Sequence, residues 1–99
     1  MNTSRFLCSH LVLLSTGGKQ LWVNLEEIWR GGALLTCEEA VGEGHDARIS
    51  SGEMVFEGRI IAVEHDELGW QVEVSFSERT PWSIEEWKPE HLLDPSTLK

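Results

Sequence analysis

The stretch EIWRGGALL, residues 27–35, brings a carboxylate, an indole and a guanidinium directly before two glycines. These groups could hold a ligand, because arginine pairs with phosphate through parallel hydrogen bonds and an indole offers a flat face for stacking. The same residues could instead form a tight turn, since Gly31 and Gly32 let the chain bend with little steric hindrance. We favour the second interpretation, in which Trp29 covers an apolar face of the fold.

Other side chains that could do chemistry lack the spacing that the chemistry needs. The pairs His45-Asp46 and His65-Asp66 have the letters of a phosphohydrolase metal core, but neighbours on a strand point to opposite faces, so we interpret them as turn residues. The remaining Cys and His side chains show no C-x-x-C or H-x-x-x-H spacing, and no nucleophile elbow, P-loop or dinucleotide fingerprint is present. The sequence therefore predicts no metal, no cofactor and no enzymatic activity.

The charge of the chain excludes several partners. Eight basic and seventeen acidic side chains give a formal net charge of -9, and the acids are spread along all 99 residues. Such a surface repels phosphate backbones and anionic lipids, so we expect no binding to DNA, RNA or membranes. Cys8 and Cys37 are too few for a disulfide framework. One bridge between them stays open as an alternative to our expectation, which is free thiols in the cytoplasm.

The first apolar run needs a separate test, because Arg5 followed by residues 6–14 imitates a signal peptide. Ser9 and His10 interrupt this run, and no small-x-small cleavage site follows it. The run is also shorter than the ~20 residues that cross a bilayer. We expect these residues to belong to the folded domain, and the length of the chain predicts a single domain over residues 1–99.

Short apolar runs separated by glycine or acid-rich breaks are typical of a small β-barrel. The expected strands span residues 11–14, 21–28, 33–37, 47–50, 54–64 and 70–78. In the fifth run Met54, Phe56, Ile60 and Ala62 should share one face around a bend or bulge at Gly58. The last run is buried on one side only, by Trp70, Val72, Val74 and Phe76. The predicted fold class is a mostly β, six-stranded antiparallel barrel.

The segment PWSIEEWKPEHLLDP predicts a short helix after the last strand, at about residues 82 to 93. Ser83 and Glu86 have the spacing of a capping box, Trp82 and Trp87 occupy the positions of a hydrophobic staple, and Pro89 ends the first helical piece. This helix is expected to close an open part of the barrel. Its apolar face consists of Trp82, Trp87, Leu92 and Leu93.

Two segments of the chain have the spacing of known binding motifs. EIWRGGA has the spacing of a D/N-x-S-x-x-G turn, with Glu27 at its acid-or-amide position, Trp29 at its serine position and Gly32 as the one residue that the motif itself has. Arg5 matches one arginine of an R-x-x-x-R segment, and Ser9 stands where the other would be. With this order of elements, the chain resembles a PilZ domain over roughly residues 5 to 93. The resemblance implies a small split or SH3-like bacterial barrel that acts as a receptor for cyclic di-GMP.

The departures from these motifs favour a function other than the binding of cyclic di-GMP. An arginine lost at Ser9 removes a charge-assisted contact worth about 1.5 to 3 kcal/mol, and Trp29 fills the place of a serine hydroxyl. We therefore predict a protein-interaction or regulatory domain with a degenerate nucleotide site. An unidentified partner protein would bind through tryptophans, which are enriched where interfaces concentrate their energy. The candidates are Trp29, Trp82 and Trp87.

The alternative is a receptor for cyclic di-GMP that uses Arg5, Arg30 and the turn at Gly31 and Gly32. Arg30 is the residue that would replace the missing arginine. The position of one side chain separates the two functions. Trp29 exposed beside Arg5 would favour the ligand site, whereas Trp29 buried in the barrel would favour protein interaction.

Overall fold

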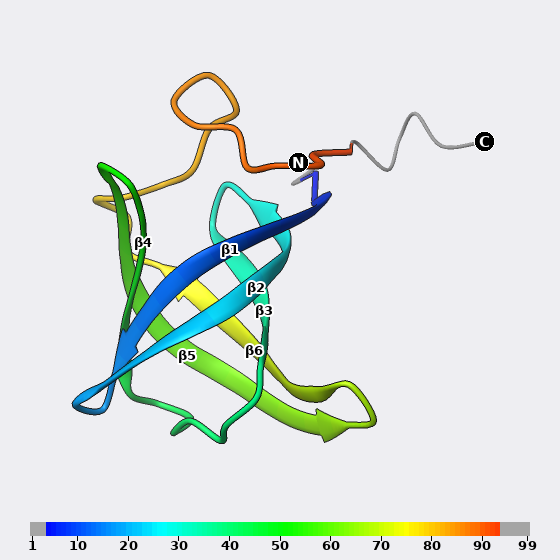
Figure 1. Ribbon diagram of the computed structural model, residues 1–99. Helices are drawn as coiled ribbons and strands as arrows, with labels where there is room; N and C mark the ends of the chain where they lie inside the picture. Colours follow the sequence, from blue (N-terminus) through cyan, green and yellow to red (C-terminus); the bar gives the residue numbers. More distant parts are fainter. Residues whose placement is uncertain (1–3, 94–99) are drawn as a thin grey trace.

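The computed structural model describes residues 4–93, which form a closed barrel of six antiparallel strands (Figure 1). The strands are β1 (Phe6–Thr16), β2 (Lys19–Trp29), β3 (Gly32–Cys37), β4 (Asp46–Ser51), β5 (Met54–Asp66) and β6 (Gly69–Phe76). Their order around the barrel is β1-β2-β3-β6-β5-β4, and pairing of β1 with β4 closes it. The predicted six-stranded antiparallel barrel is therefore confirmed.

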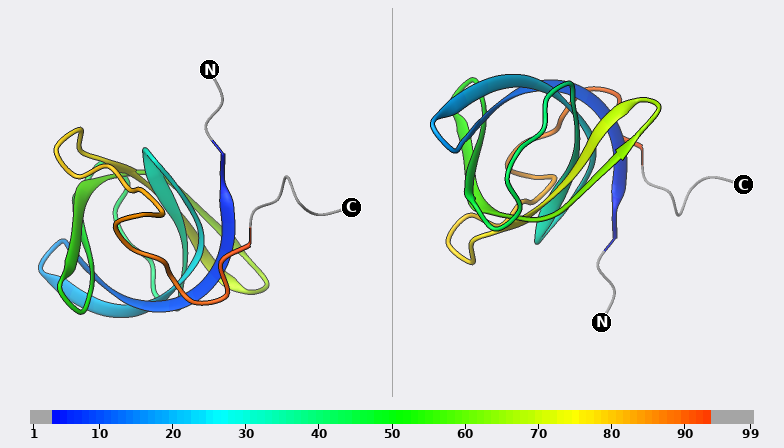
Figure 2. Two further views of the ribbon diagram at one scale, coloured as in Figure 1. Left: turned by 90° about the horizontal axis from the view of Figure 1, so that it is seen from above. Right: turned by 90° about the horizontal axis from the view of Figure 1, so that it is seen from below.

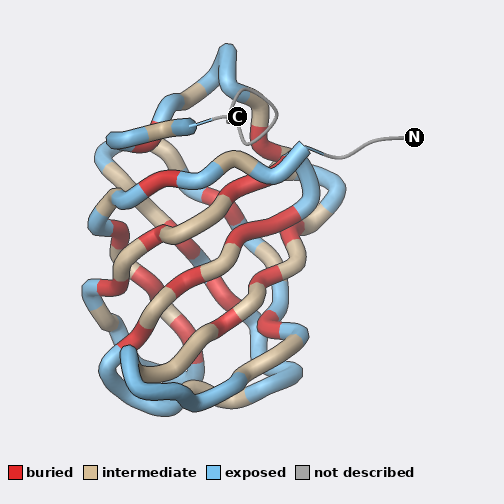
Figure 3. Tube along the Cα trace, turned by 90° about the vertical axis from the view of Figure 1, so that its right-hand side faces the viewer, coloured by how far each residue is buried: buried red, intermediate tan, exposed pale blue. Residues whose placement is uncertain are grey.

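The core lies inside the barrel, because alternate side chains of each strand point inward. Figure 3 shows this alternation as buried and more exposed positions that follow one another along the strands. On β6 the predicted inner residues Val72, Val74 and Phe76 are buried, and Trp70 at the start of the strand is partly buried against the core. The thiols of Cys8 and Cys37 also lie in the core, and both are free.

The bend expected at Gly58 is displaced along β5. The register of β5 against β6 shifts between Ile60 and Ala62. This shift turns Ala62 away from the predicted inner face, opposite Glu73, while Val63 takes the place opposite the buried Val72. Gly58 lets β5 approach β6 closely, since a Cβ atom there would collide with the backbone carbonyl oxygen of Ser75.

The predicted C-terminal helix is absent from the described residues. Residues 84–86 form one turn instead, in which the amides of Glu86 and Trp87 donate to the carbonyl oxygen of Ser83 at 3.0 and 3.2 Å. The side chain of Ser83 accepts a hydrogen bond from the amide of Glu85 at 3.1 Å, so the cap serves a turn. A helix this short before Pro89 cannot offset the cost of its nucleation.

Residues 81–93, the C-terminal strap, still cover the barrel as expected. Figure 2 shows this segment, in orange, lying across one end of the barrel. Trp82 is a core residue whose ring packs in a T-shaped arrangement with Phe6, the ring centroids 5.3 Å apart, and its Nε1 donates to the carbonyl oxygen of Trp87 at 2.9 Å. Trp87 and Leu92 are partly buried against the core, whereas Leu93 is exposed.

The strap also fills a gap in the strand pairing of β1. β4 pairs only with Leu13 to Thr16, which leaves the first half of β1 without a partner on that side. There Leu7 and Leu93 exchange backbone hydrogen bonds of 2.8 and 2.7 Å, and the amide of Glu90 donates to Nδ1 of His10 at 3.0 Å. The strap thus protects an otherwise open strand edge.

Candidate functional site

Trp29 lies on the outside of the barrel because of a register shift in β2. Val23 and Leu25 point inward, but the pairing of β2 with β3 shifts between Leu25 and Glu27, so Ile28 becomes the next inner residue. Trp29, its neighbour, then points outward and is not part of the core cluster. Its ring rests over Gly32, where a Cβ atom would lie 2.9 Å from the indole Cζ2.

Arg5 covers this outer indole. Phe6 lies opposite Ile28, which places Arg5 beside Trp29. The guanidinium carbon lies 3.8 Å from the centroid of the indole ring, a cation–π contact, and Trp29 is only 7% exposed. The indole is therefore buried, but under an arginine on the outer surface. Neither of the two expected positions, exposed beside Arg5 or buried inside the barrel, describes it.

Two carboxylates complete the surroundings of Arg5. Its Nη1 lies 3.9 Å from Oε1 of Glu27, and its Nη2 lies 3.6 Å from Oε2 of Glu73. β3 brings the two acids together, because Leu34 lies opposite both of them. We call Arg5, Glu27, Trp29 and Glu73 the Arg5 cluster. A phosphate that approaches Arg5 must compete with two carboxylates for the guanidinium.

A cleft of about 680 Å³ adjoins the Arg5 cluster. Arg5, Trp29, Arg30 and Gly31 line it together with Ser77 and Glu78. The turn is fixed from below, since the amide of Phe76 donates to the carbonyl oxygen of Gly31 at 2.7 Å. The barrel therefore gathers six of the predicted ligand residues around one place on its surface. They are Arg5, Glu27, Trp29, Arg30, Gly31 and Gly32.

Ser9 is the predicted residue that the structure leaves apart. Its hydroxyl donates to Oδ1 of Asn24 at 3.2 Å, and its amide donates to the carbonyl oxygen of Glu90. It does not line the cleft beside Arg5. The R-x-x-x-R spacing therefore places Arg5 at the cleft and Ser9 outside it, where the Ser9 hydroxyl contacts Asn24 of β2.

The tryptophan that the sequence analysis missed is Trp22, whose residue is 66% exposed. Trp22 lies opposite Leu13 on β1, Leu13 lies opposite Ser50 on β4, and Ser50 lies opposite Val55 on β5. Leu11, two residues from Leu13 on the same face, is 60% exposed. We call Leu11, Leu13, Trp22 and Val55 the outer apolar surface. The alternation of Val23 and Leu25 was the signal that could have placed Trp22 outward.

The three tryptophans proposed from sequence as contacts for a partner are less accessible than Trp22. Trp82 belongs to the core, Trp29 is covered by Arg5, and Trp87 is partly buried against the core. The side chains of Trp29 and Trp82 are therefore not free to contact a partner in this conformation.

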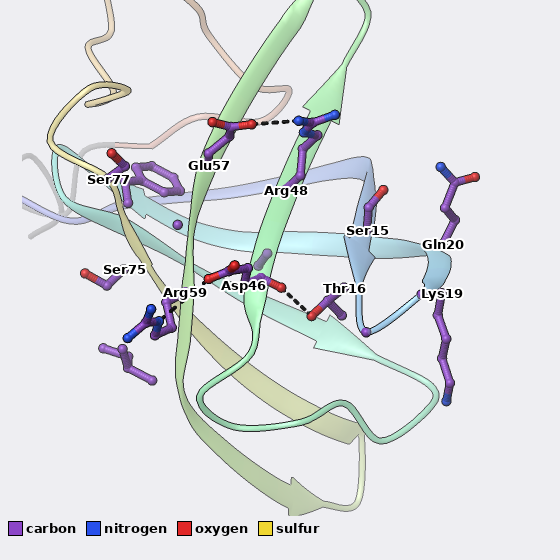
Figure 4. A pocket seen from close by; sticks show the side chains of 16 residues that line it. Ser15, Thr16, Lys19, Gln20, Asp46, Arg48, Glu57, Arg59, Ser75 and Ser77 are labelled. Carbon is purple, nitrogen blue, oxygen red and sulfur yellow. Dashed lines mark hydrogen bonds and ion pairs between the residues drawn. The ribbon is translucent and has the colours of Figure 1, made fainter.

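A second groove lies over β4 and β5 (Figure 4). Its two arginines face acids of the same groove: Nη2 of Arg48 lies 2.7 Å from Oε2 of Glu57, and Nε of Arg59 lies 3.8 Å from Oδ1 of Asp46. Thr16 donates to the backbone carbonyl oxygen of Asp46 at 2.6 Å. The groove is therefore polar but largely neutralised by its own ion pairs.

Comparison with known proteins and the structure of residues 4–93 place few limits on the function. A scan against protein-family models found none that matches the chain, and no curated protein matches its sequence. Within residues 4–93 no three His, Cys, Asp or Glu side chains are grouped so that they could hold a metal ion. The same part of the chain contains no helix long and apolar enough to cross a bilayer.

Proposed function

We propose that the protein is a non-catalytic, PilZ-like interaction module that binds a partner protein on its outer apolar surface. The observation that carries this proposal is Trp22, 66% exposed at the end of a row that continues through Leu13 to Val55. Single exposed apolar side chains are common, but neighbouring ones that include a tryptophan are typical of binding surfaces, and Ser50 is the one polar residue of this row.

The partner is expected to carry basic residues around an apolar contact. Of the sixteen acidic residues in the described part of the chain, five lie within 4.0 Å of a Lys or Arg nitrogen, which leaves eleven without a Lys or Arg partner among the described residues. The formal net charge of -9 attracts a cationic protein and repels a second copy of this chain. The outer apolar surface has four residues, fewer than the roughly 20 a side of a standard interface, so polar contacts must complete it.

The Arg5 cluster supports the view that the nucleotide site is degenerate. The guanidinium of Arg5 already stacks on Trp29 and faces Glu27 and Glu73. A bound phosphate would have to break these contacts and approach two carboxylates, which raises its free energy of binding. This arrangement favours protein interaction over nucleotide binding.

A receptor for cyclic di-GMP is the second candidate, and Arg30 is the observation that favours it. Arg30 is exposed at the cleft, and no acid within 4.0 Å of its side chain is found in the described part of the chain. Calorimetric titration with cyclic di-GMP tests this candidate. A micromolar dissociation constant that Arg30→Ala abolishes would establish it, and Ser9→Arg should leave the titration unchanged because Ser9 lies outside the cleft.

Site-specific photo-crosslinking tests the favoured function. A photoreactive side chain placed at Gln20, beside Trp22, should crosslink a basic partner in cell extract, and Trp22→Ser should reduce the product at least tenfold. Leu68→Ser is the matched control, since Leu68 is 78% exposed on another part of the barrel. Equal crosslinking by the two variants would reject the outer apolar surface. Sedimentation at low salt should show a monomer, because the net charge of -9 repels a second copy of the chain.

A further inference from the structure

Arg5 is held by three side chains that together have the chemistry of a receptor for a guanidinium group. The face of Trp29 lies under the guanidinium, and the carboxylates of Glu27 and Glu73 lie at its nitrogens. Aromatic faces bordered by carboxylates bind guanidinium and alkylammonium cations, because the ring quadrupole and the anions both attract positive charge. This arrangement has the chemistry to bind a guanidinium group of another molecule as well as that of Arg5.

The receptor is built from strands, so its geometry does not depend on Arg5. Glu27 and Trp29 belong to β2 and Glu73 to β6, and both strands pair with β3. The indole packs over Gly32, where a side chain would leave no room for it. A site held in this way is formed before its ligand arrives, which reduces the conformational entropy lost on binding.

Arg5, in contrast, is held loosely. It precedes β1, and its side chain is 50% exposed. Its distances of 3.9 and 3.6 Å to the two carboxylates exceed the roughly 2.7 to 2.9 Å of a charge-assisted hydrogen bond. Exposed ion pairs of this kind add little to stability, so another guanidinium of equal chemistry can exchange with Arg5 at small cost.

We propose that Glu27, Trp29 and Glu73 form a binding site for an arginine side chain of a basic peptide segment, which Arg5 occupies as an internal ligand until it is displaced. The charges of the adjoining cleft, Arg30 and Glu78, oppose each other, so the two carboxylates set the sign of the site. The proposal goes beyond docking on the outer apolar surface, because it concerns other residues and a ligand of its own.

Arg5→Ala empties the site and allows a test with small probes. N-acetyl-arginine amide is titrated into the variant while the indole N–H resonance of Trp29, assigned with Trp29→Phe, is followed by NMR. We expect a saturable shift with half-saturation on the order of 10 mM, and an affinity at least fivefold weaker in the wild-type chain, where Arg5 competes. N-acetyl-citrulline amide, the uncharged isostere, should cause no saturable shift.

Two further variants show whether the named residues make the site. Glu73→Gln added to Arg5→Ala should weaken binding several-fold, whereas Arg59→Ala, which removes an exposed arginine of the second groove, should behave like the wild type. Equal shifts with the arginine and citrulline probes, or no shift of the Trp29 resonance, would overturn the proposal. Arg5→Gln replaces Arg5→Ala if the latter does not fold. No partner protein is used, so failure here leaves the crosslinking test of the outer apolar surface unaffected.

Discussion

Gly32 is the residue on which the outer position of Trp29 depends. A Cβ atom at Gly32 would collide with the carbonyl oxygen of Val74 and lie 2.9 Å from the indole. We expect Gly32→Ala to lower the free energy of unfolding by about 1 to 3 kcal/mol, because neither the β6 backbone nor the covered ring can move freely. Urea denaturation measures this change, and the Trp29 indole resonance should shift with it.

Gly31→Ala is the matched control for this prediction. A Cβ atom at Gly31 would meet only Trp29 at 3.9 Å, an ordinary contact, and Gly31 is not among the glycines with positive φ. Its replacement should be neutral or stabilise the fold by up to about 1 kcal/mol through the unfolded chain. Similar losses at both positions would mean that the turn, and not the place of the indole, requires glycine.

At the scale of elements, the C-terminal strap contributes to stability through one core side chain. Trp82 is 4% exposed and its indole N–H is bonded to the carbonyl oxygen of Trp87. Trp82→Ala should lower the free energy of unfolding by about 3 to 5 kcal/mol, because it leaves a cavity under the strap. Trp22→Ala, which removes an indole of the same size from the outer surface, should change it by less than about 0.5 kcal/mol. Chemical denaturation of the two variants makes the comparison, and a strap that packs only loosely would give similar values.

Different interactions determine the conformation of the strap and that of the barrel. Each strand is fixed by alternation and by its pairing with neighbouring strands, whereas the strap depends on the packing of Trp82 and Trp87 and on backbone bonds to Leu7, Ser9 and Arg30. A capping-box pattern acts locally and cannot outweigh the burial of Trp82 in the core and the partial burial of Trp87 against it. This explains why the same residues close the barrel without forming the helix that their sequence predicts.

At the scale of the whole molecule, we expect the two core thiols to make the free energy of unfolding fall at alkaline pH. Burial raises the pKa of Cys8 from 9.0 to about 12, with Glu26 and Glu27 adding to the shift, and burial raises the pKa of Cys37 to about 11. In the unfolded chain both thiols ionise near pH 9. The stability that the neutral thiols give is therefore complete below pH 9 and is lost as the pH rises from 9 through about 12.

The urea midpoint should thus fall between pH 8 and about pH 10.5. The sequence contains no tyrosine, which removes the other side chain that usually titrates in a core at this pH. A chain with Cys8→Ala and Cys37→Ala is the control, and its midpoint should fall much less over the same interval. An equal decline in both chains would assign the effect to the lysines or to net charge.

The sequence by itself determined the strands and the closed barrel, since apolar alternation and glycine breaks act over a few residues. It also identified the segment around Trp29 as one to which several polar side chains converge. Only the tertiary structure decided what those side chains contact. The register shift after Leu25 reverses the inner and outer faces of β2 beyond that point, which takes Trp29 out of the core. Glu73 reaches Arg5 through the pairing of β3 with β2 and β6. Such contacts depend on strand register over many residues, which local sequence patterns do not fix.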